Sequence, residues 1–486
     1  MAEASTPAPR RPSGDRVAFA LLWLVFFALY LASSKGVVCS NDGSTYALMR
    51  ATAEEGTWRI DRYAAYAEYS DVARYRGHYY SDRPPGTAMV GLPIYLVVRA
   101  LAPSGQQEAL TKASTPLVAA LCGGLTVGLL FLFARVLGAS LAAALLTAVG
   151  LGLGTLLWTY STTLFSHVVA GSPVLGAVYL GTTRARAGRL SSSTLAVCGL
   201  LLGFAAISDY PTVGLGLVAG VYLLLVRQRG ESGESGLGWE RMWPLLVGGA
   251  IPLIFFAVYN DLCFGAPWSY SYAHHQAAYS RRVGTSFTSP LRGIINFLFT
   301  GPGSVNLFRA TPLFLLAVPG LALLWKRDRG TALLCCALVT AQLLVSGSHV
   351  RFWGHGRPDT RYLLAIKPYL MLPLFGVLDA GRAGTRWAPL RPVLWTAALA
   401  LLLRSVLNQM EEVAAFYHHG LEESGLRFLA GAAIAQWPRW ILPALFDPGF
   451  GAAGRTVLFP AIGVLAAALA LWLAVGERLG RHPASR

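Results

Sequence analysis

Charged residues that could do chemistry stand where apolar segments of this sequence begin or end. Asp42 follows an apolar run in the stretch SNDGSTYALMRATAEEGTWRIDR, Asp82 and Arg83 precede a second run, and Arg361 precedes a third. A carboxylate can accept a proton from a hydroxyl group, and the rigid fork of an arginine matches two oxygens of a phosphate. These residue types therefore suit group transfer that involves a phosphate. Taken singly, each also fits an ordinary loop residue or a lipid-headgroup anchor.

The composition is that of an integral membrane protein. Of the 486 residues, 54% are hydrophobic and only 13% are charged, and the mean hydropathy is +0.50. Soluble domains carry about a quarter charged residues. The net charge of +16 comes largely from arginines in short loops, as the positive-inside rule expects, so it does not indicate nucleic-acid binding. The six cysteines show no metal-binding spacing.

Apolar segments recur from end to end, and a helix of about 20 such residues crosses the hydrocarbon core. They are residues 17–38, 86–102, 113–134, 141–160, 164–182, 193–210, 212–226, 243–259, 311–325, 331–347, 362–378, 391–407 and 456–475. An outer loop at 39–85 and a basic inner loop at 184–189 require an odd number of crossings between them. Segment 86–102 is short and contains Pro93, so we expect it not to cross. The sequence thus predicts an all-α bundle of about twelve crossing helices rather than thirteen.

One membrane domain, residues 17–475, accounts for nearly the whole chain, between cytoplasmic tails at 1–16 and 476–486. Segment 17–38 reads as a retained first helix, and 230–240 as a flexible cytoplasmic linker. Most candidate residues fall in the outer segments, which are 39–85, 260–310, 348–361 and 408–455.

The first outer segment carries a helical pattern of its own. Tyr46, Met49, Ala53 and Trp58 fall roughly on one helical face. This spacing predicts an amphipathic helix that lies on the bilayer surface.

The order of motifs resembles the GT-C superfamily of lipid-dependent glycosyltransferases. The series D-x-x-x-Y-A-x-M-R and E-x-G-x-W, followed by RGHYYSDRPPG, is similar to the branch of protein O-mannosyltransferases and lipid A aminoarabinose transferases, glycosyltransferase family 39-like proteins. Asp42 matches the leading acid of that pattern, and Arg83 stands where a lysine is common. Gly43 replaces a second acid that often follows, which removes any metal or acceptor contact from that position. Later stretches, LGTLLWTYSTTLFSH, AISDYPT and FWGHGRPDTRYLLAIKPYLMLP, resemble bacterial members of the same superfamily.

The resemblance implies a GT-C-type transmembrane bundle with surface-parallel helices in the first outer loop. It further implies an inverting glycosyltransferase of the inner membrane. That enzyme would move a monosaccharide from a polyprenyl-phosphate donor to a cell-envelope acceptor (glycan, lipid or protein) on the outer face. Asp42 is then the catalytic base, and Arg83, Arg357 and Arg361 bind the donor phosphate. The expected substrate pocket consists of Tyr46, Tyr80, Asp82, His167, Asp209, Tyr210, His355 and Tyr362. Whether a divalent cation is needed stays open.

Two other functions stay open as well. A transporter or flippase of lipid-linked sugars would also be a polytopic bundle, although its ionisable groups ordinarily lie near the middle of its helices. A non-catalytic assembly protein for envelope glycans would be consistent with Gly43 in place of the second acid. The structural alternatives for single residues also remain: His167 as a packing residue, and Asp209 as a cap of the following helix. The P-loop, H-E-x-x-H and G-x-S-x-G motifs are absent from the sequence.

Overall fold

A computed structural model of the chain describes residues 12–34, 36–228, 239–277, 281, 286–352, 359–380 and 387–416, with two helical fragments at 462–464 and 467–468. Most of the expected linker 230–240 and most of the segments 408–455 and 456–475 lie outside these ranges. The described part of the chain is overwhelmingly helical, and its one sheet has two strands.

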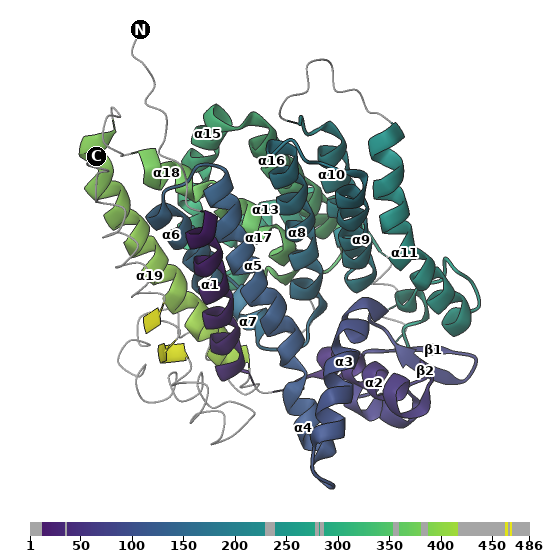
Figure 1. Cartoon of the computed structure of the whole chain (residues 1–486). Helices are drawn as coiled ribbons and strands as arrows, with labels where there is room; N and C mark the ends of the chain where they lie inside the picture. Colours follow the sequence, from purple (N-terminus) through teal and green to yellow (C-terminus); the bar gives the residue numbers. More distant parts are fainter. Residues whose placement is uncertain are drawn as a thin grey trace.

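Long helices stand beside one another in a bundle (Figure 1). They are α1 (Pro12–Ala32), α5 (Pro116–Val136), α6 (Leu141–Gly154), α8 (Ser166–Arg186), α9 (Ser192–Ser208), α10 (Thr212–Leu225), α11 (Trp239–Phe264), α15 (Ala317–Arg327), α16 (Arg329–Ser348), α18 (Leu374–Ala380) and α19 (Arg391–Phe416). Short helical pieces connect them: α7 (Leu157–Ser161), η2 (Ser271–His274), α13 (Leu291–Ile295), the π-turn η3 (Asn296–Thr300), η4 (Gly303–Val305), α14 (Leu307–Ala310), η5 (Pro312–Leu316), η6 (Arg361–Ile366), α17 (Lys367–Met371) and η7 (Ala388–Leu390).

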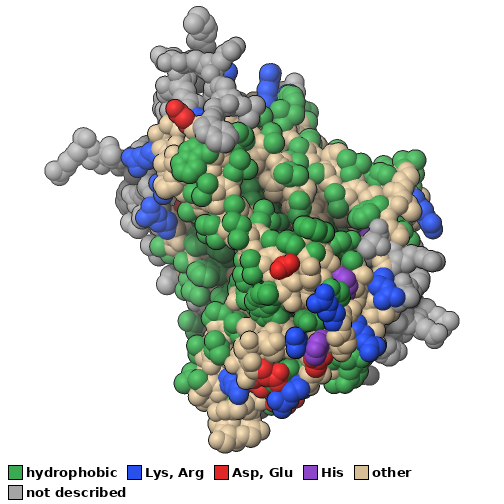
Figure 2. Space-filling model, turned by 90° about the vertical axis from the view of Figure 1, so that its right-hand side faces the viewer, with side chains coloured by type: hydrophobic (Ala, Val, Ile, Leu, Met, Phe, Trp, Pro, Cys, Tyr) green, Lys and Arg blue, Asp and Glu red, His purple; other side chains and the backbone are tan. Residues whose placement is uncertain are grey.

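Six helical stretches within the described residues are long and apolar enough to cross a membrane: Gly14–Ala32, Gln107–Val136, Glu240–Phe264, Arg329–Ser348, Arg361–Ala380 and Ala388–Val413. The outward face of α11 is apolar, with Ile251 60%, Ile254 63% and Leu262 66% exposed. Figure 2 shows a broad apolar surface on this side of the molecule, with charged side chains gathered toward its lower end. Such a surface is costly in water and suits hydrocarbon. The chain is a multi-pass membrane protein.

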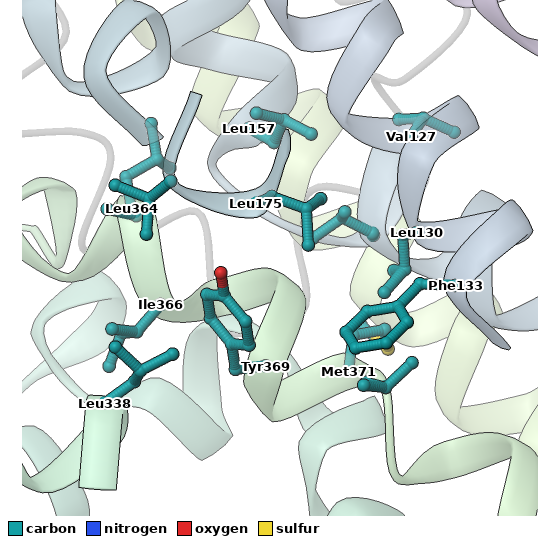
Figure 3. Close-up of a cluster of buried hydrophobic side chains, with 14 of the residues drawn as sticks. Val127, Leu130, Phe133, Leu157, Leu175, Leu338, Leu364, Ile366, Tyr369 and Met371 are labelled. Atoms are coloured by element: carbon teal, nitrogen blue, oxygen red, sulfur yellow. The ribbon is translucent and has the colours of Figure 1, made fainter. Parts of the chain in front are cut away.

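The core of the bundle is built from large apolar side chains that come from distant parts of the sequence. Leu130 and Phe133 of α5 and Leu175 of α8 belong to one buried cluster with Tyr369 and Met371 of α17 (Figure 3). Inside a bilayer the lipid is as apolar as these side chains, so close van der Waals packing holds such a cluster together. This packing fixes the positions of the segments on either side of α7 and η6, which carry polar groups described below.

A compact unit, here called the outer-loop unit, lies at one end of the bundle (Figure 1). It consists of α2 (Ser40–Glu55), η1 (Asp61–Ala67), the antiparallel hairpin β1 (Val72–Tyr75) and β2 (His78–Ser81), α3 (Pro85–Leu101) and α4 (Gln107–Ser114). The hairpin pairs Val72 with Ser81 and Tyr75 with His78. Buried apolar side chains of these elements form a second hydrophobic cluster, which also includes Val118 of α5, Val169 of α8 and Tyr259 of α11. The stretch predicted to be the first outer loop is therefore a folded unit.

Polar contacts around Glu54 hold the helices of this unit together. Glu54 accepts a hydrogen bond from Tyr63 of η1 at 3.0 Å and another from Tyr95 of α3. Arg50 pairs with Glu54 at 3.1 Å and with Glu108 of α4 at 3.4 Å. The acid is largely buried, so these charged hydrogen bonds are stronger than exposed ion pairs would be.

The prediction that the apolar stripe of 40–58 rests on the bilayer is wrong. Tyr46 is 0% exposed and Met49 is 2% exposed, and both pack inside the outer-loop unit. The stripe faces η1, α3 and α4 because those elements, which the sequence pattern of α2 alone does not reveal, cover it. The exposed apolar face of the unit belongs instead to α3, where Val97 is 57% and Leu101 is 79% exposed.

Segment 86–102 forms α3, a helix of 17 residues that contains Pro93. It packs against α2 and α4 in the outer-loop unit, at the end of the bundle (Figure 1). Twelve crossings stay a prediction, because segment 456–475 lies mostly outside the described residues.

Candidate functional site

Asp42 lies at the first turn of α2, where it caps the helix. Its Oδ1 accepts a hydrogen bond from the backbone N–H of Cys39 at 2.9 Å, and its Oδ2 accepts one from the N–H of Val38 at 2.9 Å. The hydroxyl of Thr163, from the turn between α7 and α8, donates to the same Oδ2 at 2.7 Å. The side chain is fully buried. Burial raises the pKa of Asp42, against the opposing effect of these donors, so the carboxylate is a stronger base than an exposed aspartate.

Gly43 packs directly against the backbone of η1. A Cβ atom at this position would lie 1.9 Å from the carbonyl oxygen of Tyr66. No side chain fits there without moving η1 away from α2. Gly43 stands in place of the second acid because the packing of α2 on η1 leaves no room for a side chain. An acid therefore cannot be introduced at this position without disturbing that packing.

Arg83 follows β2 and lies between two carboxylates. Its Nη2 is 3.0 Å from Oδ1 of Asp71, and its Nε is 3.2 Å from Oδ1 of Asp82. It also donates to the hydroxyl of Tyr272 at 3.3 Å. Asp82 is 1% exposed, and burial raises its pKa to about 6 even though Arg83 acts in the opposite direction. The charge of Arg83 is thus partly neutralised by its neighbours, and protonation of Asp82 would release it.

The same cluster contains the ligand types of a metal site. Asp71, Asp82 and His275 bring one potential ligand atom each within 4.8 Å of one another. Nδ1 of His275, however, accepts the backbone N–H of Ala277 at 3.2 Å, so the ring proton sits on Nε2. That nitrogen faces Oδ2 of Asp82 at 3.7 Å and has no lone pair to offer a metal. With the guanidinium already between the two acids, these residues do not fit a divalent cation.

A second buried group lies where η6 meets the bundle. Nη1 of Arg361 is 3.6 Å from Oδ2 of Asp359 and donates to the hydroxyl of Tyr160 at 3.0 Å. The Tyr160 hydroxyl in turn donates to Asp359. Lys367, six residues after Arg361, is 1% exposed and donates to Thr360 at 3.2 Å. Burying a cation inside a membrane bundle costs free energy, so a cation in this position is a candidate functional residue.

His167 and Asp209 form a close pair between α8 and the end of α9. Nδ1 of His167 is 2.7 Å from Oδ2 of Asp209, and the two side chains are 9% and 13% exposed. Pro211 and Thr212 follow, where α10 begins, so Asp209 sits at a sharp turn between two bundle helices. A buried histidine held by a carboxylate has one ring nitrogen fixed and the other directed elsewhere.

Aromatic rings connect these groups. The ring of Tyr362 lies 5.6 Å from that of His167, and the guanidinium carbon of Arg361 lies 5.9 Å from the same tyrosine ring. Tyr210 packs 5.4 Å from Tyr272, which binds Arg83. A continuous path of contacts therefore joins Arg83 and Asp209 to Arg361, and Thr163 joins Asp42 to the same region of the bundle.

Other residues expected at the site lie elsewhere. Tyr46 donates to or accepts from Thr111 at 2.9 Å in the core of the outer-loop unit, and Tyr80 packs 5.4 Å from Phe264 at its edge. Both are buried by packing and do not line the polar path. His355 and Arg357 lie outside the described residues.

The structure also adds residues that the sequence analysis did not select, namely Asp71, Tyr160, Thr163, Tyr272, His275 and Lys367. Tyr160, Thr163 and Lys367 stand inside stretches already quoted for their resemblance. Asp71, Tyr272 and His275 belong to no motif. The pairing of β1 with β2 brings Asp71 to Arg83, and the approach of η2 to β1 brings Tyr272 and His275.

Comparison with solved structures identifies the architecture. The structure of ArnT from Cupriavidus metallidurans bound to undecaprenyl phosphate matches with a TM-score of 0.52 at 17% identity, over 95% of this chain and 78% of that one. The chain has the GT-C fold. The apo form of the same ArnT has a TM-score of 0.48 at 17% identity, over 93% of this chain and 76% of that one.

A more distant GT-C structure is the Pmt1-Pmt2 protein O-mannosyltransferase complex of S. cerevisiae bound to the sugar donor. It has a TM-score of 0.37 at 17% identity, over 61% of this chain and 38% of that one. No protein-family model matches the sequence, and neither does any curated protein. The likeness is therefore one of fold, and the chemistry must be argued from this chain's own residues.

Proposed function

We propose that the protein is an inverting glycosyltransferase that transfers a monosaccharide from a polyprenyl-phosphate donor to a cell-envelope acceptor. The observation that carries this proposal is the path of side-chain contacts that links Arg83, which is 17% exposed, to the buried Arg361, with the buried acid Asp42 tied to the same region through Thr163. The GT-C fold adds support, because the ArnT structure of that fold holds undecaprenyl phosphate.

The two arginines suit the phosphate of the donor. Arg361 is 7% exposed, and its contacts with Tyr160 and Asp359 fix the direction of its guanidinium group. Arg83 is held in the same way by Asp71 and Asp82. Preorganised cations in a site that excludes water stabilise the charge that develops on the departing phosphate. Arg357, which lies outside the described residues, is proposed as a third contact.

Asp42 is proposed as the base that removes the proton of the acceptor hydroxyl. The Thr163 hydroxyl already donates to Oδ2 of Asp42, in the way an acceptor hydroxyl would. A single base and direct displacement of the phosphate invert the anomeric carbon. The pocket between them is proposed to include Asp82, His167, Asp209, Tyr210 and Tyr362, with His355 from outside the described residues.

The reaction is proposed to take place on the outer face of the cell's inner membrane. No nucleotide-sugar supply exists there, whereas a polyprenyl tail keeps the donor in the bilayer. The outer-loop unit and its charged end would then face away from the cytoplasm, consistent with basic loops at the other ends of the helices.

The test uses purified full-length protein in proteoliposomes with a panel of polyprenyl-phosphate sugars that carry a radiolabel in the sugar. Transfer of label to extracted envelope glycan, lipid or protein, with matching release of polyprenyl phosphate, supports the proposal. Movement of intact labelled donor across the bilayer without cleavage would instead identify a transporter or flippase. Donor binding with neither outcome would leave a non-catalytic assembly protein.

A further inference from the structure

His167 and Asp209 are held together by a hydrogen bond, and not by side-chain packing alone. Nδ1 of His167 donates to Oδ2 of Asp209 at 2.7 Å, which fixes both the tautomer and the direction of the ring. Among the described residues, none makes a hydrogen bond to Nε2 of His167. One nitrogen is therefore anchored, and the other is held in a fixed direction without a protein partner in the described part of the chain.

His167 and Arg361 contact the same two tyrosines. Tyr160 and Tyr362 flank His167, with ring centroids at 6.2 Å and 5.6 Å. The same two tyrosines flank Arg361, through a hydrogen bond at 3.0 Å and a ring contact at 5.9 Å. His167 therefore belongs to the same group of side chains as Arg361 of the proposed phosphate site.

A second histidine–aspartate pair shows what an ordinary surface pair looks like in this chain. His78 and Asp61 of the outer-loop unit are 2.9 Å apart, but each side chain is 40% exposed. Water reaches both partners there, so the pair is worth little and has no fixed direction. His78 thus offers a matched control for His167.

We infer that His167 is the general acid of the transfer, with Asp209 as its positioning residue. This inference rests on the proposed function. Asp42 takes the proton of the acceptor hydroxyl, and His167 supplies the proton that the departing phosphate takes up. Release of the phosphate monoester as a dianion into a buried site is unfavourable in free energy. Transfer of a proton to the departing phosphate makes its release less unfavourable.

The step balances as follows. The bond between the anomeric carbon and the phosphate oxygen breaks, and its electron pair stays on that oxygen. The acceptor oxygen forms its bond to the anomeric carbon while its proton passes to Asp42. The proton on Nε2 of His167 passes to the departing phosphate, which leaves as the polyprenyl phosphate monoanion. Exchange with solvent returns a proton to His167 and removes one from Asp42.

Asp209 acts on the transferred proton only through His167. Its carboxylate keeps Nδ1 of His167 protonated and the ring aimed at the phosphate, as the aspartate does for the histidine in a catalytic triad. The titratable and charged groups packed around His167 are Asp209 at the end of α9, Tyr160 of α7 and Tyr362 of η6, with Asp359 and Arg361 behind the tyrosines.

The first experiment measures contact without turnover. Undecaprenyl phosphate is bound to the purified full-length protein and observed by ³¹P NMR, in the wild type, His167→Gln and the control His78→Gln. The resonance of the bound phosphate is expected to shift in His167→Gln and to match the wild type in His78→Gln. An unchanged resonance in His167→Gln would show that the imidazole does not touch the phosphate.

The second experiment measures proton delivery. His167→Gln is expected to lose about 10²-fold or more in kcat while its donor Kd stays within about threefold of the wild type. The pH profile of turnover should differ from that of the wild type in His167→Gln and match it in the control His78→Gln. Asp209→Asn should lower kcat less, with His167 still in place. Added imidazole should partly restore turnover to His167→Ala, an effect that a packing role would not produce.

The outcomes separate the two proposals. A wild-type protein that neither binds undecaprenyl phosphate nor releases it from a donor overturns the proposed function and this inference together. A wild type that transfers sugar, with His167→Gln equal to His78→Gln in kcat and pH profile, overturns this inference alone. Equal losses of donor binding and kcat in His167→Gln would make His167 a phosphate-binding residue and would also overturn the acid role.

Discussion

The hydroxyl of Thr163 donates to the carboxylate of Asp42 across 121 positions of sequence, at 2.7 Å. This hydrogen bond ties the first turn of the outer-loop unit to the turn between α7 and α8 in the bundle. Both side chains are fully buried, and loss of this bond would leave the hydroxyl of Thr163 unsatisfied, whereas Asp42 also accepts the N–H groups of Val38 and Cys39. The bond therefore fixes the proposed base relative to the segment that carries Tyr160 and His167.

Gly43 is expected to tolerate no side chain. Gly43→Ala places a Cβ 1.9 Å from the carbonyl oxygen of Tyr66, so η1 must move and the core of the outer-loop unit must open. We expect a lower melting temperature in detergent and weaker donor binding. The control is Gly220→Ala in α10, where the nearest atom would be 3.5 Å away and stability should hold. Equal melting temperatures for the two variants would refute the close packing of α2 on η1.

Arg361→Ala should weaken donor binding itself. A hydrogen bond to a charged group contributes about 1.5–3 kcal/mol, so the donor Kd should rise by roughly tenfold or more. Arg361 is proposed to contact the phosphate in both the ground state and the transition state, so kcat should change little. Arg62→Ala is the control, because that side chain is 76% exposed and pairs with Glu55 on the surface of the outer-loop unit. Unchanged donor affinity in Arg361→Ala would remove Arg361 from the phosphate site.

Donor affinity should depend on pH through Asp82. Burial raises the pKa of Asp82 to about 6, so the group is neutral below that pH and ionised above it. Ionised Asp82 offsets the positive charge of Arg83. The Kd of the donor phosphodiester should therefore rise by on the order of tenfold between pH 5 and pH 7.5. Asp82→Asn should bind with the low-pH affinity throughout, whereas Asp61→Asn should keep the wild-type profile. A pH-independent wild-type Kd would contradict this role.

The topology of 86–102 can be measured in intact cells. A single cysteine at Ser104, between α3 and α4, should react with an impermeant thiol reagent added from outside, because α3 is expected not to cross. A cysteine at Ala187, after α8, should react only after lysis. Labelling of the Ser104 cysteine only after lysis would restore thirteen crossings.

The sequence was sufficient for the helical bundle because hydropathy depends on local runs of residues. Thus 243–259 became α11 and 331–347 became α16, each within a few residues. The surface against which the apolar stripe of α2 packs was not predictable from local hydropathy. Tyr46 and Met49 are apolar at helical spacing, which fits a bilayer and a protein core equally well, and only the fold of α3 and α4 decides between them.

The site shows the same division. Asp42, Arg83 and Arg361 stand out because they interrupt or flank apolar runs in a recognisable order. Their partners come from far away in sequence, as with Tyr160 and Arg361, 201 positions apart. No local pattern marks a tyrosine as the partner of an arginine at that distance, so Tyr160, Tyr272 and His275 could only come from the packed structure.

The most direct measurement of the account is release of polyprenyl phosphate from a polyprenyl-phosphate sugar by purified wild-type protein, Asp42→Asn and the control Asp61→Asn. Asp42→Asn keeps the size of the side chain but removes the base, so turnover should fall by about 10²- to 10⁴-fold. Its donor Kd should be unchanged or lower, since a buried negative charge has gone. Asp61→Asn, altered at an exposed acid, should match the wild type. Wild-type release by a folded, donor-binding Asp42→Asn protein would contradict the central claim.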